Sequence, residues 1–125
     1  MDARTTVGFI TDEHRRQYYI QVLESYRAFV EQHPAGFEGA LITMAAGLGR
    51  ITGNPPDISA LADMLCLSRT TIMRKVAVLE EAGLVQRKRN GRRVLVLSTL
   101  DLATGEGGWS LADGLILKGR DRLRA

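Results

Sequence analysis

The stretch DISALADMLCLSRTTIMRKVAVLEEAGLVQRKRNGRRVLVLS, residues 57–98, decides the fold of this chain. Its first part predicts a short helix, because Asp57 or Ser59 can cap the helix N-terminus and apolar residues then recur at helical spacing. The side chains expected to face the core are Leu61, Ala62 and Leu65. A tight turn then leads to a second helix. Within the turn segment, Cys66 among apolar neighbours is expected to be a small buried side chain.

The second helix of this stretch begins at Ser68, whose hydroxyl is placed to accept a hydrogen bond from the backbone of Thr70 or Thr71. Its inward stripe is predicted to be Ile72, Val76 and Leu79. Gly83 stands where a helix ends with a left-handed residue. We therefore expect a helix over about residues 68–82.

A β-hairpin is predicted to follow that helix. Leu84–Lys88 and Arg93–Ser98 are rich in valine and leucine and are expected to be its strands. Asn90-Gly91 between them predicts a two-residue type I′ turn, which needs a positive φ at both positions. The chain is thus expected to be mainly α with a small β-hairpin.

Charge is concentrated in the same region. Residues 68–93 carry eight lysines and arginines against two acids, a net of +6, whereas residues 1–67 have a net of −3 and residues 94–125 a net of 0. The whole-chain charge of +3 therefore hides a basic element on a mildly acidic body. Such a concentration favours a module that binds duplex nucleic acid.

Length and composition limit the remaining possibilities. A chain of 125 residues is expected to form one domain, 1–125, and its 45% hydrophobic and 25% charged content is ordinary for a soluble protein. Because it has no apolar run that could span a bilayer, no secretion signal and one cysteine, we expect a cytoplasmic protein without a membrane partner. His14 and His33 are isolated, so no metal site is expected, and no cofactor fingerprint or catalytic constellation is present.

Further helices are expected on both sides of residues 57–98. Residues 12–56 predict two N-terminal helices, the first capped by Thr11 or Asp12 and ending near Gln32. The second is marked by an apolar stripe of Phe37, Leu41, Met44, Leu48 and Ile51. Residues 99–125 predict a C-terminal helix after the glycine-rich segment 105–108, with Trp109, Ala112, Leu115, Ile116 and Leu123 on one side.

The segments SRTTI (68–72), RKV (74–76) and LEEAGLV (79–85) resemble the recognition helix and strand entry of MarR-type winged helix-turn-helix regulators. Residues 58–67 resemble the preceding helix of that motif. The resemblance implies a winged helix-turn-helix with extra N- and C-terminal helices. One departure is that Gly91 precedes the arginine pair 92–93 at the wing tip, where members of the family carry an acid, so the salt-bridged wing of the family is not carried over.

These features predict a sequence-specific, double-stranded DNA-binding transcriptional regulator. The recognition helix would enter the major groove and the wing, residues 85–97, would follow the backbone or the minor groove. The expected DNA contacts are Ser68, Arg69, Thr70, Thr71, Met73, Arg74, Lys75, Arg87, Lys88, Arg89, Arg92 and Arg93. The alternatives are a solvated basic face on a protein-interaction adaptor, or a non-specific duplex- or RNA-binding protein.

Partners of two further kinds are expected. The apolar stripes of the first and last helices could join two copies of the chain in a homodimer, or could only complete the monomer's core. A dimer would present two recognition helices about one DNA turn apart. The resemblance also implies a possible small-molecule effector between the terminal helices and the DNA-binding part, whose identity the sequence does not give.

Overall fold

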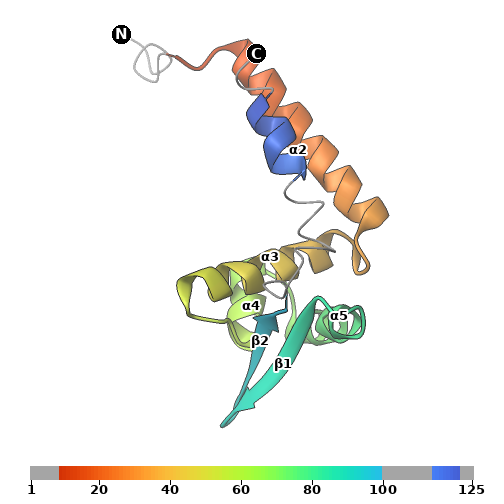
Figure 1. The fold of residues 1–125 in the computed structure, drawn as a ribbon, viewed down its shortest axis with the longest axis vertical. Coiled ribbons are helices and arrows are strands. Elements are labelled where there is room, and N and C mark those ends of the chain that lie inside the picture. Colours follow the sequence, from red (N-terminus) through yellow and green to blue (C-terminus); the bar gives the residue numbers. More distant parts are fainter. Residues whose placement is uncertain (1–8, 100–113, 122–125) are drawn as a thin grey trace.

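The computed structural model describes residues 9–99 and 114–121. Within them the chain is mainly helical with one antiparallel hairpin, as predicted. The elements are α2 (Asp12–Gln32), α3 (Gly36–Thr52), α4 (Ile58–Leu65), α5 (Arg69–Glu81), β1 (Val85–Asn90) and β2 (Arg93–Ser98), and residues 114–121 are also helical. Figure 1 shows α2 beside the helical segment 114–121, and α3 leading from them to a lobe of α4, α5 and the hairpin.

The predicted helix caps are confirmed. The Thr11 hydroxyl accepts from the backbone N–H of His14, and the Asp57 carboxylate accepts from that of Ala60 at 2.7 Å. Ser68 Oγ accepts from the N–H of Thr71 at 3.1 Å, and not from Thr70. These bonds satisfy N–H groups that no helical carbonyl reaches, so each helix begins where its cap stands.

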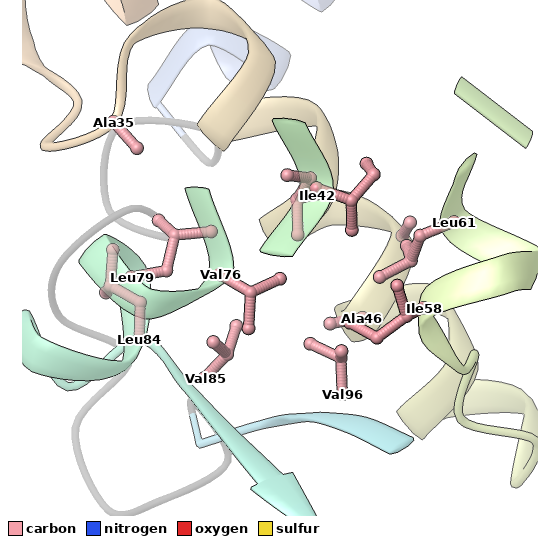
Figure 2. Close-up of a cluster of buried hydrophobic side chains, with 12 residues drawn as sticks. Ala35, Ile42, Ala46, Ile58, Leu61, Val76, Leu79, Leu84, Val85 and Val96 are labelled. Carbon is pink, nitrogen blue, oxygen red and sulfur yellow. The ribbon is translucent and has the colours of Figure 1, made fainter. Parts of the chain in front are cut away.

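The core of the lobe lies where α5 meets the other elements. Ile72, Val76 and Leu79 are fully buried, which confirms the predicted inward stripe of α5. Figure 2 shows the side chains that converge with them on one cluster, from α3 (Ile42, Ala46), α4 (Ile58, Leu61) and the hairpin (Val85, Val96). This packing fixes which side of α5 remains outside.

The apolar stripe that marks α3 in the sequence is not its core face. Met44, Leu48 and Ile51 are 41%, 55% and 76% exposed, whereas the buried side is made mostly of alanine and glycine. A Cβ at Gly49 would lie 2.7 Å from Pro56 Cδ and 2.8 Å from the Asn54 carbonyl oxygen. Small residues therefore face the core because the loop after α3 approaches the helix closely, and the larger side chains lie outside.

Two local predictions were wrong. Asn90 pairs with Arg93 at the end of the ladder, so the turn residues are Gly91 and Arg92, one position later than expected. Only Gly91, at φ +65°, has a positive φ, which is the requirement of a type II′ turn and not of type I′. Cys66 is exposed, because it ends α4 in a left-handed conformation (φ +55°) that points its side chain away from the core.

Some predictions fall on residues that are not described. Trp109, Ala112, Leu123 and the glycine-rich segment lie outside the described residues, as does the start of the predicted C-terminal helix. Within residues 9–99 and 114–121, no helix is long and apolar enough to cross a membrane. The same residues contain no group of three side chains that could hold a metal ion.

His33 is buried at the corner between α2 and α3. Its Nδ1 accepts from the Ala35 N–H (3.4 Å), and its Nε2 lies 3.4 Å from Thr43 Oγ1. The Thr43 hydroxyl donates to the Gly39 carbonyl at 3.0 Å, so we assign the ring proton to Nε2, which donates to Thr43. Burial lowers the pKa of His33 from its ordinary value of 6.5. The corner is built around a neutral imidazole.

Acid is therefore expected to destabilise this corner at a higher pH than the pH at which the carboxylates become protonated. As the pH falls below 6.5, the unfolded chain binds a proton at residue 33 before the folded chain does, so the free energy of unfolding decreases. Asp57 and Glu80 have lowered pKa values and lose their contributions only below 3.8 and 4.5. Urea unfolding at about pH 7.5 and about pH 5.5 should show the loss in the wild type and in His14→Gln, but not in His33→Gln. An unchanged pH dependence in His33→Gln would contradict this assignment.

Candidate nucleic-acid interface

The outer face of α5 carries polar and cationic side chains. Arg69, Thr70, Met73 and Arg74 are exposed on the side opposite the buried stripe, as predicted. Among the described residues, Arg74 makes no ion pair or hydrogen bond. Its guanidinium is therefore available to a ligand that approaches this face.

The first turn of α5 is partly occupied by its own cap. Ser68 Oγ donates to Thr71 Oγ1 at 2.9 Å and also accepts from the Thr71 N–H. Thr71 is half-buried, whereas Thr70 is exposed without a partner among the described residues. Thr70 thus has the freer hydroxyl of the two threonines.

The wing is tied to α5 by Arg87. Its guanidinium donates to Glu80 through Nε (3.0 Å) and Nη2 (2.7 Å), and its backbone N–H donates to the same carboxylate at 2.9 Å. These hydrogen bonds from Arg87 lower the pKa of Glu80. Arg87 therefore fixes the angle between β1 and α5, and its charge is largely matched within the protein.

A second ion pair ties the wing to α4. Arg93 Nε donates to Asp57 Oδ2 at 2.8 Å, and the backbone hydrogen bond from Val96 N to Pro56 O (2.8 Å) joins the same two segments. The hydrogen bond from the Ala60 N–H, followed by that from Arg93, lowers the pKa of Asp57. Gly91 stands where the family carries an acid, and the cap of α4 supplies an acid partner for Arg93 from outside the wing.

The remaining basic residues divide into two groups. Lys88, Arg89 and Arg92 are exposed on the hairpin and have no ion pair among the described residues. Lys75 is half-buried and its Nζ donates to the Ala35 carbonyl at 3.1 Å, at the corner between α2 and α3. Lys75 is thus directed away from Arg74 and toward the N-terminal helices.

Sequence reasoning missed the partners of these cations. Asp57 was assigned only as a cap, and Glu80 was counted only as charge. Residues 36 positions apart form the pair Asp57–Arg93, so no local spacing could reveal it. For Glu80–Arg87 the strand predicted directly after the helix gave a signal, since such a strand returns beside the last helical turn.

An apolar cavity lies at the other end of the molecule, between α2, α3 and residues 114–121. Its volume is about 610 Å³ and its lining is almost wholly apolar, including Val22, Tyr26, Phe29, Leu41 and Ile116. The Gln21 side chain donates to the Leu115 carbonyl at 2.7 Å, and Lys118 pairs with Glu24 at 3.1 Å. These two contacts hold the terminal helical segment on α2, beside which it lies in Figure 1.

The outer side of α2 is apolar and exposed. The large side chains on it are Tyr18, Tyr19, Val22, Leu23, Tyr26 and Val30, and Ile116 and Leu117 extend the surface. We call these eight residues the α2 face, of which Val22, Leu23, Tyr26 and Ile116 also line the cavity. Their exposure shows that they do not complete the core of the described monomer, and an apolar surface of this kind is typical of an interaction site.

Part of the lobe matches the model of a known protein family. Residues 52–94 match the model of the MarR family. The matched residues span the end of α3, then α4, α5, β1 and the start of β2. The sequence matches no curated protein at a significant level.

Solved structures share the fold over nearly the whole chain. MepR, a transcription regulator of the Staphylococcus aureus multidrug efflux pump MepA, aligns with a TM-score of 0.62 at 13% identity over 92% of this chain and 81% of its own. A MarR-family regulator from Rhodococcus sp. RHA1 gives 0.58 at 19% identity, over 98% and 79%. BpsR of Bordetella bronchiseptica, whose DNA binding is regulated by 6-hydroxynicotinic acid, gives 0.54 at 16% identity, over 88% and 73%. At these identities the likeness concerns the fold.

Proposed function

We propose that this chain, whose residues 52–94 match the MarR family within a MarR-type winged-helix fold, is a sequence-specific regulator that binds double-stranded DNA. The observation that carries the proposal is the outer face of α5. There Arg74, whose guanidinium has no partner among the described residues, stands beside Thr70 and Met73 on a helix whose other side is fixed in the core. A helix of this kind fits the major groove of B-DNA.

The exposed residues take different parts in this function. Arg74 reads a guanine through O6 and N7, with Thr70 and Met73 beside it as contacts to a thymine methyl or a phosphate. Ser68 and the first N–H groups of α5 suit a backbone phosphate. Lys88, Arg89 and Arg92 follow the backbone or the minor groove from the wing.

Four residues among the expected contacts serve mainly to position the others. Arg87 and Arg93 hold the wing against Glu80 and Asp57, and Lys75 holds α5 to the α2–α3 corner. Thr71 supports the cap at Ser68. Any DNA contact of these residues is made by a side chain that a hydrogen bond or ion pair within the protein already holds in place.

The functional form is a homodimer joined through the α2 face. Burial of these exposed tyrosine, valine and leucine side chains against a second copy removes apolar area from water. Two copies related by a two-fold axis then present two α5 helices to a pseudo-palindromic site. The observation in support is the exposure of the α2 face, with Leu23 67% exposed.

The cavity beside α2 is a candidate effector site. Its size suits a small organic molecule, and its apolar lining with Tyr26 favours an aromatic compound. BpsR, with the same fold, has its DNA binding regulated by an aromatic acid. An effector held between α2 and α3 would act on the corner that Lys75 joins to α5.

Selection from a random duplex pool, followed by fluorescence anisotropy at several salt concentrations, tests the proposal. We expect a preferred sequence bound more tightly than a scrambled duplex, with an affinity that falls as salt rises. Binding with a steep salt dependence and no preferred sequence would support the non-specific alternative. Absence of duplex binding at low salt would support the adaptor.

A further inference from the structure

A polar pocket lies where α4, α5 and the wing meet. Its volume is about 190 Å³, and its lining combines the start of α4 (Asp57, Ile58, Ser59), the outer face of α5 (Arg69, Met73) and the start of β2 (Arg92, Arg93, Val94). Three guanidinium groups and one carboxylate give this lining a net charge of +2. Figure 1 shows α4, α5 and β2 in the same lobe.

The walls of the pocket are held in place before any ligand arrives. Arg93 is paired with Asp57, whose side chain is only 19% exposed. An isolated β-bridge between Asp57 and Leu95 fixes the same strand to the start of α4. Because the only carboxylate is already matched by Arg93, the two remaining arginines face the pocket as an excess of positive charge.

Those two arginines keep donors to spare. Arg69 Nη1 donates to Ser59 Oγ at 2.6 Å, which orients the guanidinium and leaves its other N–H groups unused by the described residues. Arg92 is exposed and has no hydrogen bond or ion pair among the described residues. A guanidinium presents its N–H groups in a fork that matches the oxygens of a phosphate. The pocket thus offers two forks from two different elements.

We propose that this pocket binds one phosphate group, a phosphodiester of the DNA backbone, with Arg69 and Arg92 as its ligands and Asp57 and Arg93 as positioning residues. The proposal rests on the proposed function and adds a specific site to it. One phosphate bound by α5 and the wing at once fixes the depth of the recognition helix in the groove. Ser59 takes part by orienting Arg69.

The test removes the charge of single DNA phosphates. Among the contacted phosphates, a scan of methylphosphonate substitutions through the selected duplex should reveal one position in each half-site that belongs to this pocket, where the wild type loses about tenfold in affinity, the size of one charged hydrogen bond. At that same position Arg69→Gln and Arg92→Gln should lose nothing further. Each variant should also lower the slope of affinity against salt by about one.

Arg89→Gln is the matched control. It removes an exposed wing charge that does not line the pocket, so it should remain sensitive to methylphosphonate at that position. The proposal is overturned if Arg69→Gln and Arg92→Gln lose sensitivity at two different phosphates, or if neither loses it.

A second arm separates this proposal from the proposed function. Inorganic phosphate, titrated into the free protein and followed by NMR, should shift the backbone resonance of Ser59 and the side-chain resonance of Arg69 in the wild type. Arg92→Gln should reduce both shifts. If the wild type binds no duplex but shows these shifts, the proposed function fails and the pocket is a site for a free phosphate. If the shifts are absent as well, the pocket proposal fails with it.

Discussion

Leu23→Arg is expected to convert the proposed homodimer into a folded monomer and to weaken binding to the two-site duplex by about 100- to 10,000-fold. Leu23 is 67% exposed in the single chain, so an arginine there removes little packing within the monomer and keeps a good helix former. In a two-fold interface each substitution appears twice, and two charges are buried without partners. Binding to one half-site should change far less.

Light scattering and anisotropy on one-site and two-site duplexes measure this effect. Ile51→Arg is the matched control, because it places the same side chain at an exposed apolar position of α3 outside the α2 face. It should dimerise and bind as the wild type does. A dimeric Leu23→Arg with unchanged affinity would refute the assignment of the α2 face to the dimer.

Arg74→Ala is expected to remove most of the discrimination at one base pair and about 1–3 kcal/mol of binding free energy. The guanidinium of Arg74 has no partner among the described residues, so its loss should leave the fold and its stability unchanged. Selection should return a site that is degenerate at one position in each half. Circular dichroism and urea unfolding check that the variant is intact.

Arg89→Ala supplies the comparison for that experiment. It removes one exposed positive charge from the wing, where contacts to phosphate carry no sequence information. Affinity for all sequences should fall together and the preferred site should stay the same. If both variants weakened every sequence equally, Arg74 would not be the base-reading residue.

Local rules predicted the parts of the fold that depend on neighbouring residues. The caps at Thr11, Asp57 and Ser68 follow from short side chains that reach N–H groups two or three residues ahead. The inward stripe of α5 follows from helical spacing, since Ile72, Val76 and Leu79 recur every three or four residues.

Features that depend on distant contacts were not predicted. The apolar stripe of α3 marked the helix correctly but not its core face. The close approach of Pro56 to Gly49 is a tertiary contact, which helical spacing does not reveal. The hairpin turn moved by one residue because the ladder extends to Asn90 and Arg93. Among the described residues of the candidate site, sequence found the exposed cations, but it could not tell unpaired Arg74 from paired Arg87 and Arg93.

The hydrogen bond from Lys75 to the Ala35 carbonyl joins α5 to the α2–α3 corner. A rotation of α2 about this corner would pull on α5 through that hydrogen bond. In the proposed dimer, two copies of the chain are joined at the α2 face. A small change of the angle between them there would become a larger change in the distance between the two recognition helices. Because DNA fixes that distance through its helical repeat, the angle between the helices would set the half-site spacing that the proposed dimer binds.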